Sequence, residues 1–87
     1  MKTYKGVTYQ FADLTQGMAE KWTAEIKPAA DKTLPEYRGA VVREAARIGW
    51  LAEVKPDSVD SMSPALVRWL SDQLIELYND AMEVDPN

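Results

Sequence analysis

Residues 63–83 read SPALVRWLSDQLIELYNDAME, and this stretch decides the fold. Its apolar residues recur every three or four positions, the spacing that places side chains on one face of an α-helix. Ser63 supplies an N-cap and Pro64 suits the first helical turn, so the pattern predicts a helix over about 64–83. The residues before it, 57–63, are expected to form a polar connector. The apolar stripe consists of Leu66, Val67, Leu70, Leu74, Leu77, Tyr78 and Ala81. We expect this stripe to face a core.

The N-terminal residues predict a short β-hairpin that leads into a helix. Strand-forming side chains occur over 3–11, and Lys5-Gly6 supplies the turn between the two strands. Thr15 then offers an N-cap for a helix over about 15–27, which ends before a proline. The apolar stripe of this helix consists of Met18, Trp22 and Ile26.

A capping box begins the middle helix. Thr33 and Glu36 have the spacing that lets each satisfy the other at a helix start, so a helix is expected over about 34–48. Gly49 stands where a left-handed C-cap belongs. The apolar side of this helix consists of Leu34, Tyr37, Val41, Ala45 and Ile48.

Together these elements predict a mainly α fold, a small helical domain of three helices with a short N-terminal β-hairpin. The length of 87 residues suits a single domain over 1–87. The predicted core combines the three helix stripes, without Ala81, with Phe11, Leu14 and Leu51. Trp50, Leu51 and Val54 are expected to fold back over that core.

The composition excludes several kinds of site. The chain has no Cys and no His, which removes thiolate chemistry, disulfides, and the commonest general base and metal ligand. It has no glycine-rich phosphate loop and no calcium-loop spacing. No apolar run is long enough to span a membrane, and residues 1–6 lack the apolar stretch of a signal peptide. We therefore expect a cytoplasmic protein that is not an enzyme and has no cofactor or metal.

Charge is divided unevenly along the chain. Residues 56–87 contain one cation and seven acids, about −6, whereas residues 1–55 carry about +2, which gives the total of −4. The predicted last helix carries a row of carboxylates along one side: Asp72, Glu76, Asp80 and Glu83. Two carboxylates on adjacent turns could bind a divalent cation, but a solvated face opposite the leucine stripe is the simpler interpretation.

The middle helix carries three arginines, Arg38, Arg43 and Arg47. They could pair with phosphate, with carboxylates of the last helix, or with a partner protein. The isoelectric point of about 4.7 is acidic, so we expect no nucleic acid partner for this domain.

Arg68-Trp69 is the best candidate for a protein contact, because arginine and aromatic residues dominate protein interfaces. Trp69 lies beside the leucine row, so its ring either edges the core or forms an exposed anchor. Ile75, Met82 and Val84 widen the apolar arc of the last helix, as expected when a second surface is covered. The candidate partner-binding residues are Arg68, Trp69, Asp72, Ile75, Glu76, Asp80 and Glu83.

Two stretches carry a resemblance to a known class. Residues 64–72, with Leu77-Tyr78 and Asp85-Pro86-Asn87, resemble the endings of small proteins encoded in tailed-phage structural gene modules. The opening over 4–9, with Phe11 and Leu14-Thr15, is similar to the start of tail assembly chaperones or minor tail components. The resemblance implies a non-enzymatic helper, in the host cytoplasm, that covers an aggregation-prone structural protein during tail assembly. It implies no catalytic residues.

Two other functions remain open from the residues. The carboxylate row could imitate a phosphate backbone and inhibit a nucleic-acid-binding protein of the host. Alternatively, the chain could be a small structural domain that oligomerises through Trp69 and Ile75. A protein partner is expected in each case, and a homo-oligomer is one form that it could take.

Overall fold

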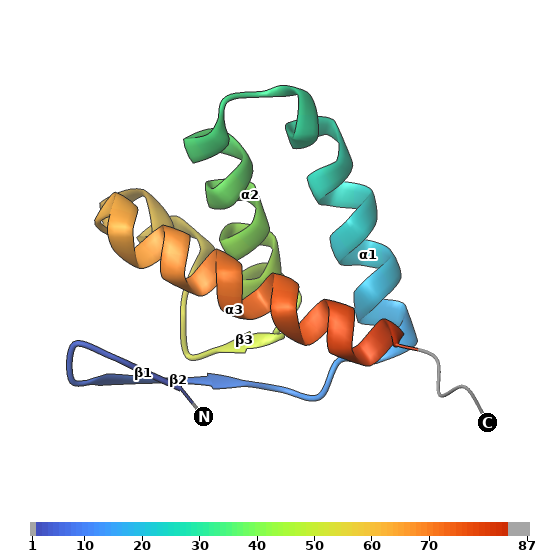
Figure 1. The fold of residues 1–87 in the computed structure, drawn as a ribbon, viewed down its shortest axis with the longest axis horizontal. Helices are drawn as coiled ribbons and strands as arrows, with labels where there is room; N and C mark the ends of the chain where they lie inside the picture. Colours follow the sequence, from blue (N-terminus) through green and yellow to red (C-terminus); the bar gives the residue numbers. More distant parts are fainter. Residues whose placement is uncertain (1, 84–87) are drawn as a thin grey trace.

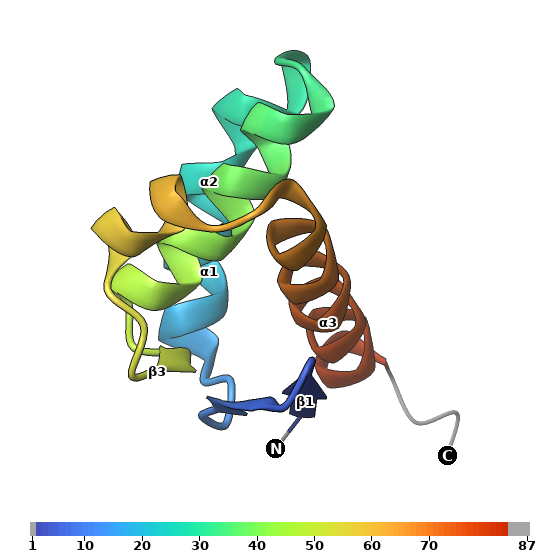
Figure 2. The ribbon, with the colours of Figure 1, turned by 90° about the vertical axis from the view of Figure 1, so that its left-hand side faces the viewer.

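The computed structural model describes residues 2–83, and it has the predicted mainly α fold with an N-terminal hairpin. Figure 1 shows α1 and α2 side by side, with α3 crossing them and the strands below. In Figure 2 the strands lie beneath the helices, and α3 stands on one side of α1 and α2. The elements are β1 (Lys2–Tyr4), β2 (Val7–Phe11), α1 (Gln16–Ile26), the 3-10 helix η1 (Lys27–Asp31), α2 (Leu34–Arg47), β3 (Leu51–Ala52), the 3-10 helix η2 (Pro56–Ser61) and α3 (Pro64–Met82).

The three long helices begin at the predicted caps. The side-chain oxygens of Thr15, Thr33 and Ser63 accept hydrogen bonds from the backbone N–H of the residue three positions on. Such bonds satisfy donors that a helix start otherwise leaves free, which is why these residues fix the boundaries. Each predicted helix, over 15–27, 34–48 and 64–83, agrees with the structure to within one residue at either end.

The hairpin turns at Lys5-Gly6, where φ is 47° and 82°. Two positive φ angles in a two-residue loop are typical of the type I′ turn, whose twist matches that of antiparallel strands. A third strand, β3, pairs with β2 through Gln10 opposite Ala52. The sequence did not predict β3, because a two-residue strand is too short to show an alternating pattern.

Gly49 ends α2 as predicted. Its φ of 84° is left-handed, and its N–H donates to the oxygen of Ala46 at 3.3 Å. The N–H of Trp50 donates to the oxygen of Ala45 at 3.0 Å, which completes a Schellman motif. The reversal directs Trp50 and Leu51 into the core, where each is 1% exposed.

The core lies around α2, which packs against α1 on one side and against α3 and η2 on the other. A helix in that position needs two apolar faces. The sequence predicted the face with Val41 and Ala45, while Val42 and Ala46 form a second face that it did not predict. Residues 57–63 are more than a connector, since η2 buries Val59.

One predicted core residue is wrong. Leu34 is 55% exposed, because the first turn of α2 lies at the end of the molecule farthest from the strands (Figure 1). The other predicted core side chains are buried or packed against the buried cluster. Leu34 therefore contributes an exposed apolar side chain beside Pro35.

Candidate protein-binding groove

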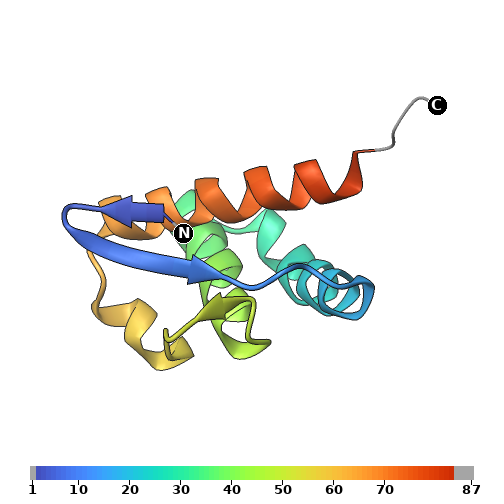
Figure 3. The ribbon, with the colours of Figure 1, turned by 90° about the horizontal axis from the view of Figure 1, so that it is seen from below.

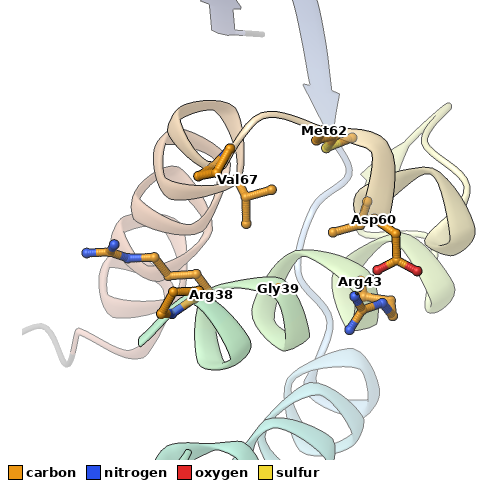
Figure 4. Close-up of a pocket in the computed structure, with 9 residues that line it drawn as sticks. Arg38, Gly39, Arg43, Asp60, Met62 and Val67 are labelled. Carbon is orange, nitrogen blue, oxygen red and sulfur yellow. Dashed lines mark hydrogen bonds and ion pairs between the residues drawn. The ribbon is translucent and has the colours of Figure 1, made fainter. Parts of the chain in front are cut away.

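A groove lies over the first half of α2, between η2 and the beginning of α3 (Figure 4). The part next to η2 and α3, called the main cavity because the apolar wall lines it, has a volume of about 210 Å³. A second cavity of about 240 Å³ adjoins it on the side of η1. Both cavities are lined by Pro35, Gly39 and Arg43. We call the two cavities together the α2 groove. Its apolar wall in the main cavity consists of Pro35, Val59, Met62, Pro64 and Val67.

Gly39 forms the floor that the two cavities share. A glycine inside a helix destabilises it by about 1 kcal/mol relative to alanine. Packing does not require a glycine here, because a Cβ at this position would lie 3.6 Å from Arg43 Nη2, an ordinary contact. The missing side chain therefore deepens the groove at the expense of helix stability.

Arg43 lines the groove at one end and pairs with Asp60 of η2. Its Nη2 donates a hydrogen bond of 2.7 Å to Asp60 Oδ1. The two side chains are 44% and 75% exposed, so solvent screens the pair and its contribution to stability is about 0.2–1 kcal/mol at most. The pair mainly holds the guanidinium over Gly39.

Arg38 stands at the other end of the main cavity. Figure 4 shows its side chain extending away from Arg43 and Asp60. Within residues 2–83 it makes no ion pair, and its guanidinium has five N–H donors for an incoming acceptor. With Lys32 in the adjoining cavity, the α2 groove has more cationic than acidic side chains on its lining, although the chain is acidic overall.

Of the three arginines of α2, the structure brings two to the groove and separates the third. Arg47 lies at the end of the helix and is hydrogen-bonded to Glu44. That bond, together with the charge of Glu44, raises the pKa of the Arg47 guanidinium, which stays charged. Arg38 and Arg43 are therefore the two arginines available to a ligand in the groove.

The predicted partner-binding residues of α3 fall into two groups. Arg68 and the four carboxylates of the row, Asp72, Glu76, Asp80 and Glu83, are exposed. Trp69 is half-buried beneath the hairpin, which runs along α3 in Figure 3. Its ring lies 5.2 Å from that of Tyr4 and 5.9 Å from that of Tyr9. Ile75 is half-buried against the core.

The remaining observations bear on function only broadly. Over residues 2–83, no three acidic side chains are grouped in a way that would hold a metal ion. The helices in the same range are too short or too polar to cross a lipid bilayer. Neither protein-family models, nor curated proteins, nor solved structures match this chain. The arrangement of its own side chains is thus the basis for assigning a function.

The sequence predicted α3 as the binding surface and missed the α2 groove. The sequence shows the arginines of α2, but the residues that complete the groove come from two other elements, η2 and α3. The sequence feature that could have indicated the groove is Gly39. A glycine inside a helix lowers its stability, so its presence there suggests a packing or functional role.

Proposed function

We propose that this chain is a non-enzymatic protein-interaction domain and that the α2 groove is its binding surface. The observation that carries the proposal is the combination of an apolar wall with Arg38 and Arg43 in a cavity of about 210 Å³. Sites for small molecules and cofactors are usually single pockets of about 300–1,000 Å³, whereas the α2 groove is divided into two cavities of about 210 and 240 Å³. Each cavity suits one or two side chains of another protein. Apolar residues with arginine are also what protein interfaces favour.

The resemblance to tailed-phage proteins supplies the finer part of the proposal. The chain would act in the host cytoplasm as a tail assembly chaperone or minor tail component, and its partner would be a structural protein of the tail. Leu34, exposed beside Pro35, adds apolar area next to the groove. The carboxylate row of α3 would then keep the complex solvated.

The proposal is tested by co-expression with each structural protein encoded beside the gene. We expect one of them to become more soluble and to co-purify with the chain. Arg38→Glu should weaken that co-purification, because it reverses a charge in the groove. Arg68→Glu, the same change on exposed α3, is the matched control and should leave it intact. If instead Arg68→Glu weakened co-purification and Arg38→Glu left it intact, the binding surface would be on α3.

The carboxylate row gives less support to imitation of nucleic acid. Asp72, Glu76 and Asp80 are four residues apart, which places one carboxylate about every 6 Å along the helix. A DNA strand has one phosphate about every 3.4 Å. The row thus has roughly half the charge density of a single strand. If Asp72→Asn with Glu76→Gln abolished binding to a nucleic-acid-binding protein, imitation of nucleic acid by the carboxylate row would replace protein binding in the α2 groove as the proposed function.

A further inference from the structure

The C-terminal turn of α3 has the chemistry that the α2 groove lacks. Met82 is 41% exposed, one of three large apolar side chains that are exposed within residues 2–83. Asp80 and Glu83 flank it in sequence and are exposed as well. Neither carboxylate makes an ion pair with another residue in that range. This turn presents an apolar side chain between two unpaired acids.

The groove offers the opposite set of groups. Met62, Val67 and Val59 provide an apolar wall, and Arg38 and Arg43 are the cations of the same cavity. A methionine is flexible and fills irregular apolar gaps well. Asp60 does not close the site, because its side chain is 75% exposed and the Arg43 guanidinium has further N–H donors for a second carboxylate.

The two surfaces cannot meet within one molecule. Val67 lines the groove, and Met82 lies 15 residues further along the same helix. At 1.5 Å per residue, the two positions are about 22 Å apart along the α3 axis. The last turn of α3 can therefore reach an α2 groove only in a second copy.

We propose that the α2 groove of one molecule binds the last turn of α3 of a second copy. Met82 would enter the apolar part, while Asp80 and Glu83 would face Arg38 and Arg43. This inference rests on the proposed function, since it names a partner for the same groove. The contact joins two different surfaces, so in a pair of copies one molecule keeps a free groove and the other a free helix end. Further copies then extend the pair into a filament or close it into a ring.

Sedimentation velocity of the full chain tests the contact. We expect the average mass to rise with protein concentration at low salt and to rise less at high salt, because the charges are exposed. Arg38→Glu should abolish association by reversing a charge in the groove. A second variant, Asp80→Asn with Met82→Ser and Glu83→Gln, should abolish it by removing the ligand. Circular dichroism establishes that each variant is folded.

Mixing these two variants gives the decisive result. One keeps an intact helix end and the other an intact groove, so the mixture should form a 1:1 dimer and nothing larger. Arg68→Glu, a charge reversal outside both surfaces, should associate like the unmodified chain. A mixture that stays monomeric would overturn the inference, as would association lost in Arg68→Glu.

The inference and the proposed function fail in different ways. If the unmodified chain is monomeric at every concentration but Arg38→Glu still loses the tail protein, the groove binds a partner and only self-association is wrong. If Arg38→Glu changes neither self-association nor co-purification, the groove is not a binding surface, and both the inference and the proposed function are wrong.

Discussion

The indole Nε1–H of Trp22 in α1 donates a buried hydrogen bond of 3.0 Å to the main-chain oxygen of Val41 in α2. The same ring meets that of Trp50 edge-on at 5.1 Å and that of Tyr78 at 5.1 Å. One side chain thus joins α1, α2, α3 and the chain leading into β3. Trp22 is 2% exposed and fixes the distance at which α1 packs on α2.

Replacing that side chain should destabilise the fold in a measurable way. Trp22→Phe removes the donor and leaves a gap, and we expect the free energy of unfolding to fall by about 2 kcal/mol. Urea denaturation should report a lower midpoint with an unchanged slope. Trp69→Phe is the comparison, because that ring is half-buried and makes no side-chain hydrogen bond within residues 2–83. An equal loss in both variants would contradict a special role for Trp22.

The left-handed turn after α2 gives a second prediction. Gly49 has φ of 84°, where a Cβ is strained by about 1–2 kcal/mol. Gly49→Ala should lower the free energy of unfolding by that amount, measured by thermal or chemical denaturation. Gly17→Ala is the matched control, because Gly17 lies in α1 without a positive φ and a Cβ there meets nothing within 4 Å. That control should be neutral or stabilising, and a loss in it would show that the strain argument is incomplete.

Two adjacent residues of α3 should respond in opposite directions. Leu70 is 0% exposed, and Leu70→Ala should cost about 2–5 kcal/mol through the cavity that it leaves. Ser71 is 1% exposed, and within residues 2–83 its hydroxyl has no hydrogen-bond partner. Ser71→Ala removes an unpaired buried group and favours the helix, so stability should rise by about 0.5–1.5 kcal/mol. A loss on Ser71→Ala would mean that the hydroxyl is bonded in solution.

Local signals explain why the helices could be predicted from the sequence. Thr15, Thr33 and Ser63 cap helices with hydrogen bonds to residues three positions away, and Gly49 ends α2 with bonds of similarly short range. Interactions of that range are encoded in neighbouring residues. The predicted burial of Leu34 was wrong for a related reason. Periodicity shows which face of a helix is apolar, but it does not show where along the helix the neighbouring elements stop covering that face.

The parts that could not be predicted depend on distant segments. β3 exists because the Schellman turn places Leu51 opposite Phe11, a pairing between residues 40 positions apart in the sequence. The second apolar face of α2, which includes Val42, can be interpreted as core only once α2 is known to lie between the other helices. The α2 groove needs Asp60 and Val67 beside Arg43, and no periodicity relates these positions. The sequence is compatible with Trp69 either at the core edge or as an exposed anchor. In the structure the hairpin covers its ring, which lies half-buried at the edge of the core.

Gly39 should separate stability from binding in a single substitution. Gly39→Ala adds a methyl group to the floor of the α2 groove, where it contacts Arg43 without a clash. Alanine is the better helix residue, so thermal denaturation should show a gain of about 0.5–1 kcal/mol in unfolding free energy. The shallower groove should bind Met82 of a second copy less well, and sedimentation should show weaker self-association. Such an exchange of stability for binding is common at functional sites.

The control for Gly39→Ala is the same substitution at Gly17, which lies outside the groove. Both changes exchange a helical glycine for alanine, so both should stabilise or leave stability unchanged, but only Gly39→Ala should weaken association. If both variants associate like the unmodified chain, the depth of the groove at Gly39 is irrelevant to binding. If Gly39→Ala instead lowers stability, the expectation that a methyl group fits at this position is wrong, because the exposed Arg43–Asp60 pair, at about 0.2–1 kcal/mol, is too weak to outweigh the helical gain.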